Sequence, residues 1–336
     1  MAIIRQHSPY DRPGKSLGLL YIVSIIAGSL LACACIAQPY PLKPVRVIVN
    51  FPPGAGSDIA TRLVTAKLTE MMGQQFLVDN RAGAAGNIGI EVAARAAPDG
   101  YTLLTATAAA AISQTMFSKI PFDLNRDFTP IAMIASAPFV LAVHPAVPAK
   151  SLQELIVLAK SRPGQLSYAT PGTGSSPHLA GELLKMQAGI DLLHVPYKGM
   201  VPAITDVIGG NVSIIFGNTL VVLPNMRNGR VRGLAITSAK RSSMAPELPT
   251  IAESGFPDFE SGTWYGMMAP ARTPRDVVAR LSDAVTRSVQ LPDVREKLIA
   301  QGAEPLSSNP AQMAEFVRSE IVKWGKVAKA AGIRVQ

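Results

Sequence analysis

The sequence predicts an α/β protein made of two lobes with a mainly parallel sheet in each. Strand-like and helix-like segments alternate along the chain, which is typical of parallel sheets with helices on both faces. The motif Pro-Gly-x-Gly-Ser occurs between a strand and a helix at residues 53–57 and again at 171–175. A strand-like run at 262–270 follows the second motif and would return the chain to the first lobe. We therefore expect two crossings between the lobes, which make a hinge.

These crossings define the expected domains. Lobe 1 should comprise residues 38–142 and 261–336, and lobe 2 residues 143–260. A pair of prolines, at 145 and 148, marks the beginning of the second lobe.

The elements of lobe 1 follow from local patterns. Apolar runs bounded by turn residues predict buried strands, and apolar residues near a 3.6-residue period predict helices. On this basis strands are expected at 45–51, 74–80 and 101–107, with one or two more within 128–145. Helices are expected at 59–72 and, after the glycine-rich turn "RAGAAGNIG", in a second segment that ends at about residue 97.

The elements of lobe 2 and of the C-terminal segment are bounded by capping signals. Ser151 with Glu154 forms a capping box, which predicts a helix to about Ser161. Thr273-Pro274 and Asn309-Pro310 each place a cap before a proline, so they predict the starts of two final helices. Further strands are expected at 164–170, 211–217 and 231–237, and a further helix at 177–189.

The N-terminal segment is typical of an export signal. Three basic residues precede an uncharged apolar run at 17–37 that ends in small residues. We expect residues 1–37 to be a signal peptide that is removed. A retained membrane anchor is an alternative, because the run approaches the length of a spanning helix. A lipoprotein acylated at Cys33 or Cys35 is a third.

Composition narrows the classes of partner. Without the leader the chain has no cysteine, so its core alone must hold it, and about 300 residues suffice for that. The formal net charge of the whole chain is +9, but the basic residues are scattered and no aromatic residues alternate with them. Nucleic acid is therefore not expected as a partner. The positive field favours an anionic small molecule.

The two glycine loops predict an anion site. Glycine lets a ligand approach the backbone closely, and the first N–H groups of a helix lack internal partners. The helix macrodipole adds positive potential at the same place. One such loop in each lobe, facing across a cleft, would form a clamp with two jaws. Neither loop has the third glycine of a dinucleotide fingerprint or the Gly-Lys-Ser/Thr of a P-loop, so nucleotides are not expected.

Signatures of catalysis and of metal binding are weak. In "GSSPH" (174–178), His178 takes the place of the second glycine of a nucleophile elbow. His144, His178 and His194 show no ligand spacing typical of a metal site. We expect no enzyme activity, no metal and no cofactor. His178 lies in the first turn of the helix after the second loop, where it can reach a ligand.

Five stretches, in order along the chain, resemble one known family. They are "YPLKPVRVIVNFPPGAGSD", "VDNRAGAAGNIGIEVAARAAPDGYTLL", "YATPGTGSSPHLAGELL", "HVPYKGMVPAITDVIGGNV" and "GTWYGMMAPARTP". The chain resembles the periplasmic solute-binding proteins of tripartite tricarboxylate transporters, the Bug family. The resemblance implies a type II, Venus-flytrap periplasmic binding-protein fold and a monomer. It also implies a small organic acid as ligand and the membrane permease subunits of the transporter as partners.

The resemblance also implies which residues bind the ligand. Most belong to the two loops, where backbone N–H groups and Ser or Thr hydroxyls can donate to a carboxylate or to its waters. Asp58 would repel a carboxylate, so we expect it to cap the helix or to hold a water. The expected ligand-binding residues are Gly54, Ala55, Ser57, Asp58, Thr105, Thr170, Gly172, Thr173, Gly174, Ser175, His178 and Tyr197.

Some positions depart from the family pattern. Ala55 stands where a second glycine is frequent, and Ser213 and Gly217 stand where aspartates are frequent. The stretch 105–113 is more apolar than usual. These changes indicate a less cationic and more apolar ligand, although the sequence does not identify the acid.

Three side chains are further candidates for the far wall of the pocket. They are Lys198, Trp264 and Tyr265. For Trp264 the favoured interpretation is core packing beside the hinge, and a solvated position is the usual one for a lysine such as Lys198.

The leading functional hypothesis is capture of a carboxylate and its delivery to a transporter in the periplasm. A periplasmic sensor that docks on a signalling receptor, and an enzyme on the same fold, are the alternatives.

Overall fold

The computed structural model describes residues 1–2, 40–117 and 119–333. All of the elements below lie in one compact unit, Lys43–Gln336. The signal peptide expected over residues 1–37 falls outside the described residues, apart from the first two.

The compact unit contains the same β-α-β-α-β-α sequence twice. In each half three parallel strands are ordered so that the first lies in the middle: β2-β1-β3 and β6-β5-β7. The first half consists of β1 (Val45–Val49), α2 (Gly56–Met72), β2 (Phe76–Asn80), the short 3₁₀ helix η1 (Ala84–Gly86), α3 (Asn87–Ala94), β3 (Thr102–Thr107) and α4 (Ala108–Met116). The second half consists of β5 (Ser167–Thr170), α6 (Ser176–Ala188), β6 (Leu193–Pro196), α7 (Met200–Ile208), β7 (Ile214–Asn218) and α8 (Thr219–Arg227).

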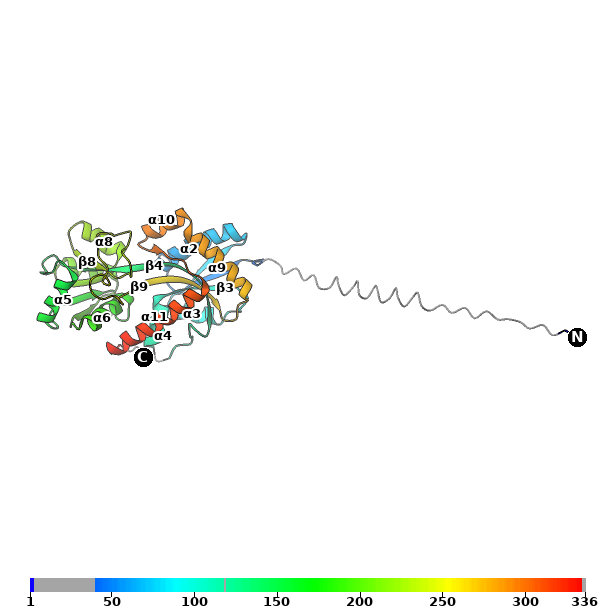
Figure 1. Cartoon of the computed structure of the whole chain (residues 1–336), viewed down its shortest axis with the longest axis horizontal. Coiled ribbons are helices and arrows are strands. Elements are labelled where there is room, and N and C mark those ends of the chain that lie inside the picture. The colour runs from blue at the N-terminus through cyan, green and yellow to red at the C-terminus, as the bar shows by residue number, and fades with distance from the viewer. Residues whose placement is uncertain (3–39, 118, 334–336) are drawn as a thin grey trace. The chain divides into compact units, whose positions relative to one another are not determined.

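Two long strands join these halves. Strand β4 (Phe128–Val143) pairs with β9 (Gly262–Pro270) over its first part and with β7 and β8 (Arg232–Ile236) over its second. Strand β9 in turn pairs with β3, and all of these contacts are antiparallel. Figure 1 shows β4 and β9 running between the two groups of strands. The two-lobed α/β fold and the returning strand at 262–270 are confirmed, and the apolar run at 128–145 forms one strand.

The remaining helices cover the sheet, and a short strand extends it. The helices are α5 (Leu152–Ser161), α9 (Arg275–Gln290), α10 (Pro292–Ala300) and α11 (Pro310–Ala330), and the strand β10 (Glu304–Pro305) pairs with β4. The caps expected at Ser151 and Asn309 are confirmed, because each side chain accepts the N–H of the third helical residue. The capping box expected at Ser151 is wrong in its second half, because Glu154 Oε2 accepts from the Lys150 N–H at 2.7 Å. The cap expected at Thr273 is wrong: its hydroxyl donates to the Pro270 carbonyl, and Pro274 is the residue that precedes the helix.

Several short elements had no expectation from the sequence. Helices α4, α7, α8 and α10 have nine residues each, and β6 has four. Segments of this length carry too few turns for the apolar period to be distinct. Packing against the sheet, rather than local pattern, stabilises them.

The core beside the crossing strands contains Trp264. Its indole N–H and that of Trp324 both donate to Glu320 Oε2, each at 2.9 Å, and its ring meets Phe316 edge-on at 5.6 Å. Glu320 also forms an ion pair with Lys323. Trp264 is therefore a core residue, packed on the side of β9 that faces α11.

Candidate clamp between two helix N-termini

The strand directions place the carboxyl ends of both parallel groups toward one another. Thr107, at the end of β3, pairs with Tyr265 near the start of β9, where the chain comes from the second half. Asn218, at the end of β7, pairs with Phe139, in the middle of β4. Because the other strands of each group are parallel to β3 or to β7, the helices that follow them begin at the facing edges. In open α/β sheets this edge is where ligands bind.

The first glycine loop presents the start of α2. Ala55 precedes the helix with φ −67° and ψ 155°, and Gly54 has φ +82°, a value that favours glycine. The Gly54 N–H donates to Asp58 Oδ2 at 2.9 Å, and the Ala55 N–H donates to the Pro52 carbonyl at 3.2 Å. No described side chain caps this helix end. The N–H groups of residues 56–58 are thus the ones left to meet a ligand.

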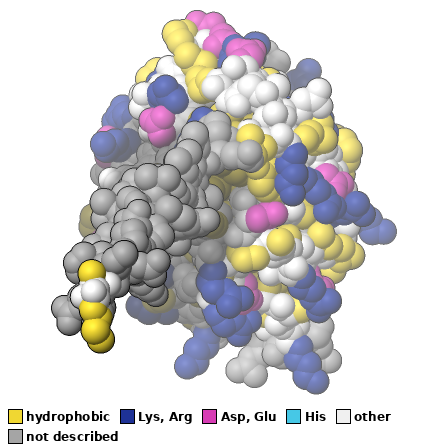
Figure 2. Space-filling view, turned by 90° about the vertical axis from the view of Figure 1, so that its right-hand side faces the viewer, with side chains coloured by type: hydrophobic (Ala, Val, Ile, Leu, Met, Phe, Trp, Pro, Cys, Tyr) yellow, Lys and Arg dark blue, Asp and Glu magenta, His cyan; other side chains and the backbone are white. Residues whose placement is uncertain are grey.

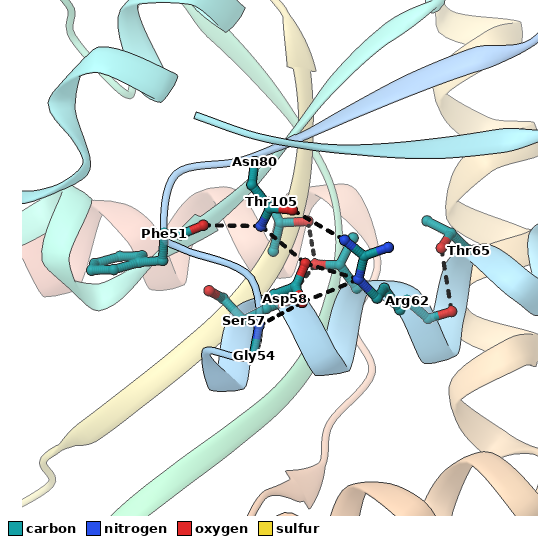
Figure 3. A network of polar contacts seen from close by, with 9 residues as sticks. Phe51, Gly54, Ser57, Asp58, Arg62, Thr65, Asn80 and Thr105 are labelled. Atoms are coloured by element: carbon teal, nitrogen blue, oxygen red, sulfur yellow. Dashed lines mark hydrogen bonds and ion pairs between the residues drawn. The ribbon is translucent and has the colours of Figure 1, made fainter. Parts of the chain in front are cut away.

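Asp58 organises this loop from inside the helix. It is the third residue of α2 and only 2% exposed, so the expectation that it is the N-cap residue is wrong. Its carboxylate also accepts from Arg62 Nε at 3.0 Å and from Asn80 Nδ2 at 2.9 Å (Figure 3). Burial by itself would raise the pKa of Asp58, but the hydrogen bonds from Arg62, the Gly54 N–H and Asn80 outweigh it and lower the pKa.

We expect Asp58→Asn to destabilise the protein by about 1–2 kcal/mol, because an amide turns a donor toward groups that already donate and loses the ion pair with Arg62. Urea unfolding measures the loss. The matched control is Asp276→Asn, which neutralises an exposed carboxylate in the first turn of α9 and should change stability by less than about 0.5 kcal/mol. Equal losses in the two variants would show that Asp58 acts only through the helix dipole.

The second glycine loop has a similar backbone geometry, but here the Ser175 hydroxyl caps the helix by accepting the His178 N–H at 3.4 Å. Ser175 precedes α6 with φ −70° and ψ 156°, and Gly174 has φ +79°. The Gly174 N–H donates to His178 Nδ1 at 3.0 Å, and the Ser175 N–H donates to the Gly172 carbonyl at 3.2 Å. His178 is the third residue of α6, as Asp58 is of α2. Each loop is therefore held by the third residue of its own helix.

This geometry corrects the register of the repeat. The motif aligned Gly54 with Gly172, whereas the structure matches Gly54 with Gly174, two residues further on. Pro177 causes the difference. A proline is tolerated only in the first turn of a helix, and a start of α6 at Gly174 would put Pro177 fourth, where its N–H is needed.

The other expected site residues lie close to the loops with their polar groups already engaged. Thr105 is fully buried and accepts from the Thr61 hydroxyl at 2.9 Å. The Thr170 hydroxyl bonds His194 Nε2 at 2.7 Å, and the Tyr197 hydroxyl donates to Asp206 at 2.5 Å. Of the remaining candidates, Ser57 is buried, and Thr173 and Lys198 are exposed.

His178 belongs to a buried aromatic cluster. Its ring stacks on that of His194 with 3.8 Å between centroids, and Tyr168 lies beside both. The Tyr168 hydroxyl donates to Glu182 at 2.6 Å. Burial and the neighbouring His194 lower the pKa of His178 to about 4, and burial lowers the pKa of His194 as well. His178 is therefore neutral at pH 7 and accepts the loop N–H.

Four buried polar side chains at the facing edges were not anticipated. Asn50 directly follows the buried strand β1, and Asn218 is the last residue of β7. Asn87 begins α3, and Thr107 precedes α4. Each has a side-chain polar atom without a hydrogen-bond partner among the described residues. Such atoms normally have a partner, and a ligand or an ordered water is the kind of group that can supply it. A polar residue directly after an apolar strand, as in "VRVIVN" and "SIIFGN", is the signal that points to two of them.

The positive charge of the protein is spread over its surface. On the face in Figure 2, Lys and Arg side chains are interspersed with acidic and apolar ones. Within the described part of the chain, no cluster of His, Cys, Asp and Glu is arranged to hold a metal ion, and no helix has the length and apolar character to span a membrane.

Two lobes joined by crossing strands, with helix N-termini at the facing edges, form the architecture of the periplasmic-binding-protein fold. The family model described as "Tripartite tricarboxylate transporter family receptor" matches residues 59–333. The chain belongs to this family of solute-binding receptors.

Individual relatives agree with this assignment. Protein BugT of Bordetella pertussis is 36% identical over 95% of this chain and 98% of its own length. The structure of R. palustris Rpa4515 with adipate is 37% identical, with a TM-score of 0.73, and covers 88% of this chain and 99% of its own. The structure of MatC from Rhodopseudomonas palustris with bound malate is 32% identical, with a TM-score of 0.69, over 86% and 99%.

Proposed function

We propose that this protein captures a small carboxylic acid between its lobes in the periplasm and delivers it to the membrane subunits of a tripartite tricarboxylate-type transporter. The observation that carries this proposal is the equivalence of the two loops. The start of α2 leaves the N–H groups of residues 56–58 free, and the start of α6 leaves that of Ser176, so one anionic group can be met from both sides. The acids named with two relatives, adipate and malate, are both dicarboxylates, which suits this site.

The same geometry supports binding without chemical change. Asp58 and His178 are the titratable side chains of the two loops, and each is buried and already accepts a loop N–H. Their protons and lone pairs serve the loop conformation. We therefore propose that the protein is a receptor and not an enzyme, and that it acts as a monomer.

The domain boundaries belong to this proposal. Residues 38–142 with 261–336, and residues 143–260, are proposed to move as rigid lobes about the crossing strands β4 and β9. Closure brings the two helix N-termini onto the ligand, because each loop alone supplies half of its donors.

The test uses mature protein purified under native conditions, with adipate and malate as probes. We expect native mass spectrometry to show 1:1 binding of a carboxylate that is recovered unchanged, and scattering to show a smaller radius of gyration when it is bound. A chemically altered acid would make the protein an enzyme. An unchanged radius at saturation would refute lobe closure, and no stabilisation by any carboxylate of a broad panel would refute the function itself.

A further inference from the structure

The Tyr265 side chain points away from the core around Trp264 and Glu320, toward the facing edges of the two groups of parallel strands. Successive side chains of a strand point to opposite faces of the sheet. Since Trp264 faces α11 and bonds Glu320, Tyr265 faces the other way. A Cβ atom at Gly56, the first residue of α2, would collide with the Tyr265 hydroxyl oxygen. The hydroxyl therefore lies directly at the N-terminus of α2.

The Tyr265 hydroxyl has no hydrogen-bond partner among the described residues, although the side chain is only 8% exposed. Burial raises its pKa to about 12, so it carries its proton at every physiological pH. The hydroxyl oxygen is not among the fully buried unpaired atoms, so it reaches the space in front of α2, where a ligand can supply the acceptor that a tyrosine hydroxyl normally finds. At this place the protein supplies donors, the free N–H groups of α2, and an anion brought by a ligand is the acceptor that suits them all.

Thr107 reinforces this arrangement from the next strand. It is the residue directly opposite Tyr265 in the antiparallel pair β3–β9, so the two side chains lie on the same face. Thr107 is 3% exposed, and its hydroxyl is also without a partner in the described structure. Thr107 thus brings a second unpaired hydroxyl to the face of the sheet from which Tyr265 reaches the N-terminus of α2.

We infer that Tyr265 is a ligand-binding residue whose hydroxyl donates to the carboxylate oxygen held at the N-terminus of α2, with Thr107 beside it. The inference rests on the proposed function and adds a side-chain donor from the crossing strand β9. Because β9 joins the lobes, this donor lies at the floor between the two jaws. It favours an anionic oxygen, since the N–H groups around it offer nothing to a cation.

The decisive variant is Tyr265→Phe, which removes one oxygen and keeps the ring. Binding of adipate and malate is measured by calorimetry, and unfolding is measured without ligand. We expect Kd to rise roughly ten- to a hundredfold, the cost of a lost hydrogen bond to a charged group. The midpoint of unfolding without ligand should stay unchanged, because the hydroxyl has no partner among the described residues.

A spectroscopic signature separates contact from indirect effects. In protein labelled with ¹³C at the tyrosine ζ carbon, the Tyr265 signal, assigned by its loss in Tyr265→Phe, should shift on adding adipate or malate. A second variant, Gly56→Ala, keeps the hydroxyl but pushes it from its place, and should weaken binding as well. The control is Tyr101→Phe, just before the opposite end of β3, which should bind like the wild type.

The outcomes distinguish this inference from the function. If the wild type binds a carboxylate and Tyr265→Phe binds it with the same Kd, the inference is overturned and the proposed function stands. The same holds if the Tyr265 signal does not move at saturating ligand. Absence of binding by the wild type, to adipate, malate and a broad carboxylate panel alike, overturns both.

Discussion

Valine at position 54 or at position 174 should remove most of the stabilisation that ligand gives to the protein. Both glycines have φ near +80°, which a β-branched residue adopts only under strain. The strain breaks the N–H bond to Asp58 or to His178 and turns the loop away from the ligand. A lost hydrogen bond to a charged group costs roughly 1.5–3 kcal/mol, so each change should weaken binding about ten- to a hundredfold.

Thermal unfolding with and without adipate or malate measures how much the ligand stabilises each protein. At a hundred times its Kd a ligand stabilises the wild type by about 2.7 kcal/mol, and either variant should lose most of that at the same concentration. The double variant should lose less than both single changes added, since the two loops contact one ligand.

Gly73→Val is the matched control. Gly73 ends α2 with φ +72° and, like Gly54, has no atom within 4 Å of a built Cβ. It should cost stability but leave affinity intact. If Gly54→Val loses binding while Gly174→Val binds as the wild type does, the second loop is a simple turn and the two-sided clamp is refuted.

Acid should destabilise the protein through His178. Its pKa is about 4 in the folded protein and about 6.5 in the unfolded chain, so the unfolded chain takes up the proton first as pH falls. The stabilising contribution is full above pH 6.5 and is lost between 6.5 and 4. The complete loss is about 3 kcal/mol, and about 2 kcal/mol of it falls between pH 7 and 5.

The charged and titratable groups around His178 act on its pKa in both directions, and those that lower it prevail. His194 on β6 stacks against it and repels a second charge, as does Lys185 on α6, while Glu182 opposes them. Tyr168 on β5 stays protonated, because burial and its bond to Glu182 raise its pKa. Protonation of Nδ1 in the folded protein would also break the bond from the Gly174 N–H, so ligand affinity should fall as the pH drops through the folded pKa of about 4.

Urea unfolding from pH 7 to 5, with the histidine Cε1 proton signals recorded in parallel, measures this effect. His178→Asn is the informative variant, because an amide oxygen replaces Nδ1 as acceptor but does not titrate. Its stability should fall less steeply with acid than that of the wild type, by about 2 kcal/mol over this interval. Parallel curves for the two proteins would assign the acid sensitivity elsewhere.

Much of the fold was readable from local pattern. Strands such as 45–51 and 262–270 are long apolar runs between turn residues, and α2 and α11 are long enough to show their period. The glycine loops were readable because a strand, a glycine pair and a helix must follow each other in the chain. These features depend on residues a few positions apart, so the sequence by itself determined them.

The details of the site depend on residues far apart. Pro177 sets the start of α6, and so pairs Gly54 with Gly174 and not with Gly172, but only the folded loops make the equivalence visible. Trp264 and Tyr265 are neighbours in sequence, yet one packs on Glu320 and the other reaches Gly56. The faces of β9 are decided by which helices cover it, and burial against those helices selects one orientation of the strand. That choice is a property of the tertiary structure, because the pattern "TWYG" allows either face inward.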